Sequence, residues 1–299
     1  MVREVAEALQ ADAGGWFVDC TLGLGGHSRA ILESSPEARV LVVDRDSRAL
    51  EMAREELKPF GDRFRCVHAN FKDVAAWKGA LPEAPAGLLA DLGLSGYQLK
   101  ASRGFSFSDT EALDMRMDPE TGLSARDFVN TASEEEIIHV LRAFGEEPMA
   151  RRIARAIEEV RASAPIEDAA SLARIVHGAV PARFHGRVHP ATRTFQAIRI
   201  FVNQELEGLG TFIEEAAGAL RAGGRIVILA YHSLEDRIVK QAFAAMAKGC
   251  ICPPRLPVCA CGRTPSLRLV SRKALRPSVE ETTRNHASRS ARLRVGERL

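Results

Sequence analysis

The chain has 299 residues, of which 46% are hydrophobic and 27% are charged, with a formal net charge of +2. No apolar stretch approaches the roughly 20 residues that a membrane-spanning helix needs, and the first ten residues lack the apolar centre of a signal peptide. These features argue against a membrane protein or an exported one, and they predict a cytoplasmic globular protein of about two domains.

The first third of the chain alternates short apolar runs with helical patterns. The runs are residues 16–20, 39–44, 64–70 and 86–93. The clearest helical pattern between them is SRALEMAREELKPF. Strands that alternate with helices predict an α/β fold with a doubly wound parallel sheet, and apolar runs without polar alternation fit strands covered on both faces.

The pattern changes after Gly93. Between about residues 103 and 201 helical patterns dominate, and Ser133 and Glu136 have the spacing of a capping box. Residues 195–220 read as one long helix, after which 223–232 form another buried strand and a further helix follows. The sequence therefore predicts a discontinuous α/β domain, residues 1–102 and 202–299, interrupted by an all-helical insertion domain at 103–201.

A glycine-rich loop, in DCTLGLGGHS, follows the first predicted strand. A P-loop would need a lysine after its last glycine, but His27 follows Gly26. The dinucleotide fingerprint fails at its third glycine, where Ser28 stands. Asp44 ends the second strand, where it can accept hydrogen bonds from the ribose hydroxyls of either a nicotinamide cofactor or S-adenosyl-L-methionine.

Two further carboxylates favour the second cofactor. Asp19 directly precedes the glycine loop, and Asp91 ends the fourth predicted strand. Negative side chains repel a pyrophosphate, whereas S-adenosyl-L-methionine carries a sulfonium and an ammonium and has no phosphate. The pattern therefore favours a methyltransferase over a dehydrogenase. Methyl transfer itself needs no metal, because the sulfonium already activates the methyl group.

Six later blocks are more specific. In chain order they read DLGLSGYQL, RGFSF, LDMRMD, HPATRTFQAIRIFVNQEL, YHSLEDRIVK and SRSARLRV. With the glycine loop, they resemble the bacterial 16S ribosomal RNA cytosine-N4 methyltransferase family over nearly the whole chain. The chain starts just after the family's usual His-x-Pro-Val segment, which we expect to weaken the N-terminal edge of the site. Gly96 and Tyr231 stand where the family usually has Ser and Phe, and we expect both changes to be tolerated.

The resemblance implies the fold, the reaction and the cofactor contacts. It implies a methyltransferase domain with a helical insertion that contacts RNA, and methylation of the N4 amine of a cytidine in the decoding region of 16S ribosomal RNA. The cofactor contacts implied for S-adenosyl-L-methionine are Gly25, Gly26, His27, Asp44, Phe71, Asp91 and Gln98. Taken alone, His27 is more typical of a helix start and Phe71 of a core, whereas a carboxylate such as Asp91 at the end of an apolar strand needs a partner.

Asp91 is also the candidate proton acceptor. The DLGL segment lacks the Pro-Pro and the aromatic residue that DNA amino-methyltransferases carry at this point, and Tyr97 is a candidate either for stacking on the base or for a structural role. Ser233, with Asp236 three residues on, is expected either to cap the following helix or to contact substrate. The remaining substrate-binding candidates are Arg116, Arg193, Arg199, His232, Arg289, Arg292 and Arg294.

Basic residues collect in the second half of the chain. Residues 1–150 carry 16 Lys and Arg against 26 Asp and Glu, whereas residues 151–299 carry 25 against 13. Residues 263–299 alone have ten basic and three acidic residues. This asymmetry predicts a polyanionic partner, here 16S ribosomal RNA within the small ribosomal subunit, although solvated helix faces give the same composition. No membrane partner is expected, and a homodimer is left open.

The six cysteines fall into two groups. Cys20 and Cys66 lie in strand-like runs and are predicted to be buried thiols. The other four, which read C-x-C, six residues, C-x-C, are Cys250, Cys252, Cys259 and Cys261. Structural zinc sites more commonly use pairs separated by two to four residues, so a reduced loop without metal is preferred and a zinc site is kept as the alternative.

Overall fold

A computed structural model of the chain describes residues 1–93, 103–107, 110, 112–186, 189–253, 258 and 260–299. The chain divides into two compact units, one formed by Met1–Gly93 with Leu206–Leu299 and the other by Leu94–Glu205. We call them the sheet unit and the helical unit. The domain boundaries expected from the sequence, 103 and 201, both fall inside the helical unit.

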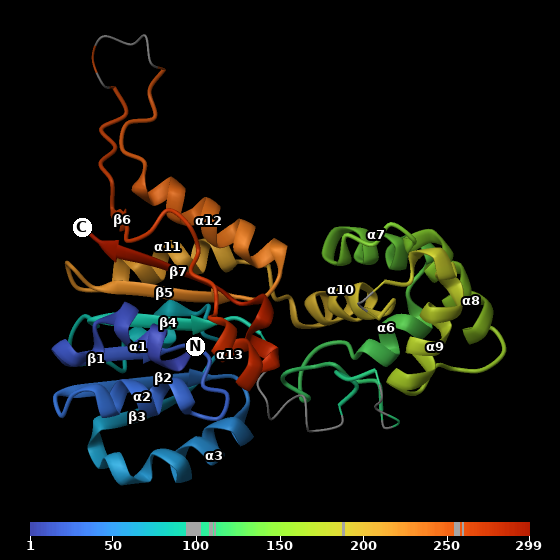
Figure 1. Cartoon of the computed structure of the whole chain (residues 1–299), viewed down its shortest axis with the longest axis horizontal. Coiled ribbons are helices and arrows are strands. Elements are labelled where there is room, and N and C mark those ends of the chain that lie inside the picture. The colour runs from blue at the N-terminus through green and yellow to red at the C-terminus, as the bar shows by residue number, and fades with distance from the viewer. Residues whose placement is uncertain (94–102, 108–109, 111, 187–188, 254–257, 259) are drawn as a thin grey trace. The chain divides into compact units, whose positions relative to one another are not determined.

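The sheet unit contains one seven-stranded sheet in the described part of the chain (Figure 1). Its strands are β1 (Gly15–Asp19), β2 (Ala38–Asp44), β3 (Phe64–His68), β4 (Gly87–Asp91), β5 (Arg225–Ala230), β6 (Leu267–Leu269) and β7 (Arg292–Arg298). They lie in the order β3-β2-β1-β4-β5-β7-β6. The five strands predicted from the sequence, β1 to β5, are parallel, and β7 runs antiparallel to both β5 and β6. The predicted α/β class is therefore confirmed.

Helices cover both faces of this sheet, because successive strand residues point to opposite sides and both sides are apolar. Phe17 shares one buried cluster with α1 (Val2–Leu9), α2 (Gly26–Ser34) and α3 (Ser47–Leu57). Val18 shares the other with α4 (Val74–Lys78), α11 (Leu209–Ala219) and α12 (Ser233–Ala247). Cys20 is buried as expected, but Cys66 is only half-buried. A short helix, α13 (Val279–Arg284), precedes β7.

The strand order places a topological switch point at β1 and β4. From β1 the chain proceeds outward to β2 and β3 on one side, and then returns to β4 and β5 on the other. Parallel α/β sheets bind ligands at the carboxyl ends of the strands where the order reverses. The ends of β1 and β4, together with the loops that leave them, are therefore the place to look for a site.

The helical unit is formed by α6 (Ala125–Thr131), α7 (Glu134–Gly145), α8 (Ala150–Arg161), α9 (Ala169–Ala179) and α10 (Thr192–Asn203). These helices pack around one apolar cluster that includes Phe128, Ile153 and Ile198. The capping box predicted at Ser133 and Glu136 is confirmed at the start of α7. Among the described residues of this unit, the sole β feature is an isolated bridge between Ala112 and Asp168.

The single long helix expected at 195–220 is wrong. Helix α10 ends at Asn203, Gln204 adopts a left-handed φ of 50°, and α11 begins only at Leu209, after Gly208 at φ 67°. The Asn203 side chain also accepts a hydrogen bond from the Met117 N–H. The apolar period continues across the break, which is why the pattern concealed it. None of the helices in the described ranges has the length and apolar character needed to cross a membrane.

Candidate functional site at the switch point

The glycine loop joins β1 to α2. Gly25 is the N-cap of α2 and adopts a φ of 78°. Residues with a Cβ rarely adopt this left-handed conformation. Gly26 and His27 follow as the first two residues of the helix. The first turn of a helix presents backbone N–H groups without intrahelical partners, which suit an anionic group such as a carboxylate.

Asp19 holds this loop in place and does not face a ligand. Its side chain is fully buried, accepting a hydrogen bond from the Ser28 hydroxyl at 2.6 Å and another from the Thr21 N–H at 3.2 Å. Burial raises the pKa of Asp19 to about 7, against the opposing effect of the Ser28 hydrogen bond. The expectation that Asp19 contributes charge to a cofactor pocket is therefore wrong. Ser28, at the position of the missing third glycine, is its structural partner.

Asp91 lies at the centre of a small polar network at the end of β4. Its Oδ1 accepts a hydrogen bond from the Tyr231 hydroxyl at 2.8 Å, and its Oδ2 lies 3.6 Å from Nδ1 of His27. Its backbone N–H donates to the Thr21 hydroxyl at 2.7 Å. These contacts hold the carboxylate in place. Because its side chain is still 23% exposed, it can also contact a ligand.

Burial shapes the ionisation of this network. Burial raises the pKa of Asp91, and the nearby His27 and the Tyr231 hydroxyl act in the opposite direction. Burial also lowers the pKa of His27, although Asp91 opposes this. Nε2 of His27 is buried and has no hydrogen-bond partner in the described part of the chain. A buried polar atom in this state is one that a bound molecule would satisfy.

Asp44 ends β2, on the other side of β1 from β4. Its Oδ1 accepts a hydrogen bond from the Asp46 N–H at 2.9 Å, and burial raises its pKa. Asp46 itself caps α3. Asp44 and Asp91 therefore flank the glycine loop, one on each neighbouring strand. We call Asp44, Asp91, His27 and the start of α2 the switch-point site.

Two aromatic residues and one amide complete the predicted cofactor and base contacts. Phe71 follows β3, is half-buried, and packs edge-on against Phe212 with ring centroids 4.9 Å apart. This packing matches the core alternative for Phe71. Gln98 and Tyr97 lie outside the described residues. Cofactor contact by Gln98 and base stacking by Tyr97 stay predictions.

The helix after β5 is capped differently from the expectation. The N-cap of α12 is His232, whose Nδ1 accepts from the Glu235 N–H at 3.4 Å, and Ser233 is the first helical residue. The His232 ring also lies 3.1 Å from the Glu235 carboxylate and is 8% exposed. The capping pair of Ser233 with Asp236 is therefore wrong. His232, a candidate for substrate contact, is mostly buried as part of the cap.

The model of the MraW methylase family matches residues 1–299. The chain belongs to the MraW methylase family. It is 48% identical to a ribosomal RNA small subunit methyltransferase H from Syntrophus aciditrophicus, with 100% of this chain and 96% of that protein covered. It is 49% identical to the protein of the same name from Dehalococcoides mccartyi, with 100% and 85% covered. A solved rRNA methylase from Streptococcus thermophilus matches with a TM-score of 0.41 and 12% identity, covering 100% of this chain and 93% of that one.

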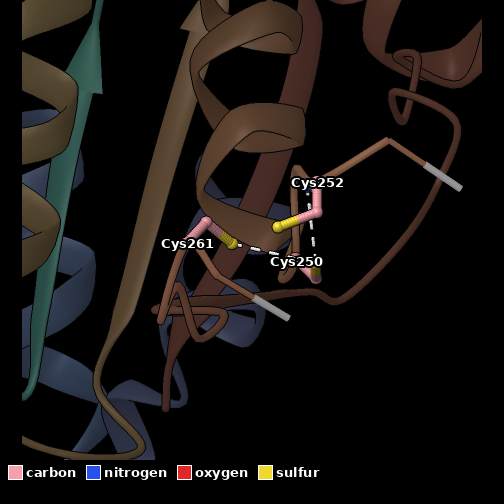
Figure 2. Close-up of side chains that lie close together, drawn as sticks. All are labelled: Cys250, Cys252 and Cys261. Carbon is pink, nitrogen blue, oxygen red and sulfur yellow. Dashed lines mark hydrogen bonds between the residues drawn. The ribbon is translucent and has the colours of Figure 1, made fainter. Parts of the chain in front are cut away.

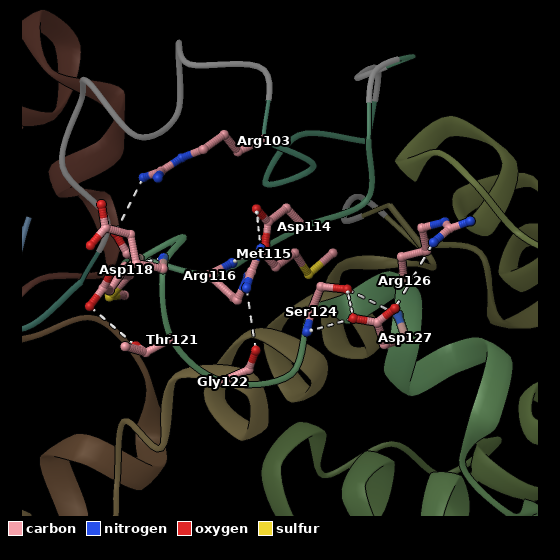
Figure 3. Close-up of polar contacts among 12 residues, drawn as sticks. Arg103, Asp114, Met115, Arg116, Asp118, Thr121, Gly122, Ser124, Arg126 and Asp127 are labelled. Carbon is pink, nitrogen blue, oxygen red and sulfur yellow. Dashed lines mark hydrogen bonds and ion pairs between the residues drawn. The ribbon is translucent and has the colours of Figure 1, made fainter.

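In this MraW methylase family member, two of the candidate arginines in the helical unit are already paired. Figure 3 shows Arg116 against Asp114, with Nε 2.6 Å from Oδ1, while its Nη1 donates to the Gly122 carbonyl. Arg199 makes a two-pronged ion pair with Glu205 at 2.8 Å. Arg193 is exposed and donates to the Glu146 carbonyl at 3.3 Å. Of these three arginines, Arg193 presents the most accessible charge.

The basic C-terminal segment also differs from its appearance in the sequence. Arg292 and Arg294 lie on β7 and both bind Asp236 of α12, at 2.7 Å and 2.6 Å. They bind β7 to that helix, so the structure assigns them a structural contact. Arg289 precedes β7 and is exposed.

A groove lined by arginines was not predicted from the sequence. It has a volume of about 540 Å³ and lies between α8 and α9 of the helical unit. Its exposed basic side chains are Arg151, Arg152, Arg155 and Arg174. We call these four residues the arginine groove. The signal was the spacing of Arg151 and Arg155, four residues apart and so on one face of α8.

Proposed function

We propose that this chain transfers the methyl group of S-adenosyl-L-methionine to the N4 amine of a cytidine in 16S ribosomal RNA. The chain is a member of a methylase family, and its relatives carry the name of ribosomal RNA small subunit methyltransferases. The observation that carries the proposal is the switch-point site, where Asp44 and Asp91 flank a glycine loop that leads into the N-terminus of α2.

The chemistry of these residues fits S-adenosyl-L-methionine. In this proposal the carboxylate of Asp91 attracts the positive ammonium and sulfonium groups, and Asp44 accepts hydrogen bonds from the ribose hydroxyls. The first turn of α2 offers N–H groups to the methionine carboxylate. His27 adds a buried ring nitrogen for which the described residues provide no hydrogen-bond partner. A dinucleotide would instead bring its pyrophosphate towards two acidic side chains.

We infer that Asp91 is the residue that acts on the acceptor. When bound, S-adenosyl-L-methionine supplies a methyl group on a sulfonium. The N4 amine of cytosine is a poor nucleophile, because its lone pair is delocalised into the ring, so the protein must position it and accept a proton. The Asp91 carboxylate is held by Tyr231 and His27. Its raised pKa makes it a stronger base than an exposed aspartate.

The arginine groove and Arg289 are the proposed contacts to RNA. Exposed arginines bind phosphates of any sequence, and they position a nucleic acid without reading its bases. The target cytidine must reach Asp91, so it must be unpaired or turned out of its stack. This arrangement suits a structured substrate, the small ribosomal subunit with its decoding region, in the cytoplasm.

A labelling experiment tests the proposal. Small ribosomal subunits from cells that lack this protein are incubated with it and with cofactor labelled in the methyl group, and the RNA is digested and analysed by mass spectrometry. We expect label in N4-methylcytidine alone. Asp91→Asn is expected to remove most of this label, whereas the exposed Glu51→Ala on α3 serves as the matched control and is expected to retain it.

The rival class is a nucleic-acid-binding scaffold that keeps the cofactor and catalyses nothing. It would bind both cofactor and ribosomal particles and yet leave no label in the RNA. Label in a different nucleoside would also contradict the proposal.

A further inference from the structure

Three cysteine thiols converge in the segment that follows α12 (Figure 2). The Sγ atoms of Cys250, Cys252 and Cys261 all lie within 4.8 Å of one another. The segment belongs to the sheet unit and connects the end of α12 to β6 (Figure 1). Cys261 comes back to within 3.7 Å of Cys250, sulfur to sulfur. The chain therefore folds back on itself at the point where the thiols are.

The distance between the sulfurs of Cys250 and Cys261 is that between two ligands of one metal ion. A disulfide needs its sulfur atoms about 2.05 Å apart, and the sulfurs of Cys250 and Cys261 are much farther apart than that, at 3.7 Å. Thiolates at about 2.3 Å from a tetrahedral zinc ion lie about 3.8 Å from one another. The 3.7 Å between Cys250 and Cys261 matches this tetrahedral edge.

Backbone amides surround the same sulfurs. The N–H groups of Ile251, Cys252 and Ala260 donate to Sγ of Cys261, Cys250 and Cys252 respectively, at 3.5, 3.4 and 3.3 Å. Such donors stabilise the negative thiolate, which is the form that binds metal, and they fix the direction of each sulfur. Each thiol of the cluster thus receives its own backbone donor.

We propose that Cys250, Cys252 and Cys261 bind one zinc ion, each thiol losing its proton on binding. Soft thiolate ligands select zinc over magnesium, calcium or manganese. The segment also has little packing of its own, since the residues Ile251 and Val258 are 51% and 74% exposed. A metal ion supplies the cross-link that an apolar core would supply elsewhere. Cys259 lies outside the described residues and stays unchanged in every variant below.

The ion holds the segment and takes no part in methyl transfer. Helix α12 has 15 residues and is therefore about 22 Å long. Tyr231 lies just before its N-terminal end and Cys250 follows its C-terminal end, so the two sites are separated by the length of the helix. Arg263 and Ser266 then tie the returning chain to the last turns of α12, through the carbonyls of Ala245 and Met246.

The test is zinc binding to the full-length protein. Reduced protein is stripped with a chelator and titrated with zinc, and cobalt is used as a spectroscopic substitute that reports thiolate ligands and tetrahedral geometry. We expect wild type to bind one zinc per chain. Cys250→Ser and Cys261→Ser are expected to lower the affinity by at least about tenfold. Cys66→Ser, in β3, is the matched control and is expected to bind like wild type. Zinc should raise the Tm of wild type and the control only.

Several results would overturn the proposal. They are wild type with less than one zinc per chain, variants that bind zinc as tightly as wild type, a cobalt spectrum without thiolate bands, or an iron–sulfur cluster in the protein as purified. The proposal is independent of the methyltransferase assignment, because Asp91→Asn protein is expected to bind zinc normally whatever its activity.

Discussion

The hydroxyl of Tyr231 donates a 2.8 Å hydrogen bond to the carboxylate of Asp91. The two residues meet because β4 and β5 are parallel neighbours and end at the same edge of the sheet. Gly93 permits the contact, since a Cβ at that position would lie 3.0 Å from the Tyr231 ring. The resemblance to the 16S ribosomal RNA cytosine-N4 methyltransferase family implies Phe at the position of Tyr231. The Tyr231 hydroxyl therefore adds a hydrogen bond to the proposed proton acceptor. The sequence alone predicts only that this exchange is tolerated.

Tyr231→Phe is expected to move the acidic limb of the pH–rate profile. Burial raises the pKa of Asp91, and the Tyr231 hydroxyl opposes that rise. Without the hydroxyl the pKa of Asp91 rises further, so Asp91 becomes protonated, and inactive as a base, at a higher pH. Removing a hydrogen bond of about 1.4 kcal/mol corresponds to a shift of about one pH unit.

The profile is measured in single turnovers with saturating cofactor. Cofactor affinity, followed by calorimetry, is expected to change little in this variant. An acidic limb at the same pH in Tyr231→Phe and wild type would contradict the assignment of Asp91 as the base.

Asp44→Ala is expected to weaken cofactor binding. The carboxylate is proposed to accept ribose hydroxyls, and losing such hydrogen bonds costs about 1–3 kcal/mol, or about ten- to a hundredfold in affinity. Calorimetric titration with S-adenosyl-L-methionine measures the effect, with the exposed Glu51→Ala as control. Equal affinities of Asp44→Ala and wild type for S-adenosyl-L-methionine would contradict the assignment of Asp44 as a cofactor contact.

Four of the parallel strands, β1, β2, β4 and β5, could be predicted from the sequence because each is a short, mostly apolar run. The remaining parallel strand, β3, includes Arg65 and His68, and none of its residues is fully buried. The capping box of α7 could be predicted because both partners are three residues apart. Pairings between distant residues could not. On β7, Arg292 and Arg294 alternate with apolar Leu293, yet their partner Asp236 lies 56 and 58 residues away. Without that partner the arginines look like a basic tail, and the strand they belong to was missed.

Contacts between distant residues also decide the switch-point site. The sequence predicts Asp19 and Asp91 at the ends of buried strands, and the structure has both residues there. The two carboxylates cannot be told apart by position alone. Asp19 is completely buried and accepts a hydrogen bond from Ser28. Asp91 binds Tyr231, which is 140 residues later in the chain, and keeps part of its surface exposed.

Arg294→Ala is expected to destabilise the fold, and Arg289→Ala is not. Arg294 is 14% exposed and binds the mostly buried Asp236, which would be left with Arg292 alone. Although burial opposes it, these two arginines hold the pKa of Asp236 below its usual value. We expect the free energy of unfolding of Arg294→Ala, measured in urea, to fall by about 1–3 kcal/mol. Exposed Arg289 is expected to leave it within about 0.5 kcal/mol. Equal stability of the two variants would contradict this assignment.

Asp19→Asn is expected to stabilise the protein at alkaline pH. The pKa of Asp19 is about 7 in the folded state and about 3.9 when unfolded. Between these values the folded state holds a proton that the unfolded state has released, so the free energy of unfolding falls as pH rises from about 4 to 7. Asparagine does not titrate, and its amide can keep the hydrogen bond with Ser28.

Urea unfolding of both proteins at pH 5 and pH 8 tests this sign. Relative to wild type, Asp19→Asn is expected to gain about 2.5 kcal/mol between the two pH values, because about two pH units lie between pH 5 and the folded pKa. A constant difference between the two proteins would show that Asp19 is already ionised in the fold.

The last prediction concerns the arginine groove. Replacing Arg151, Arg155 and Arg174 with alanine removes three exposed charges while the buried face of α8 and α9 is unchanged. If the groove binds phosphates, the KM for small ribosomal subunits rises and the dependence of binding on salt becomes shallower by about one unit for each arginine–phosphate pair that is removed. Arg142→Ala, an exposed arginine of α7 outside the groove, is the matched control. Cofactor affinity is expected to be unchanged in both variants, because the switch-point site lies in the sheet unit.

Free cytidine has no phosphates for these arginines to bind, so we expect it to be a very poor substrate for wild type and for both variants. A triple variant with wild-type KM across a salt series would place the RNA-binding surface elsewhere, and efficient methylation of free cytidine would contradict RNA as the substrate.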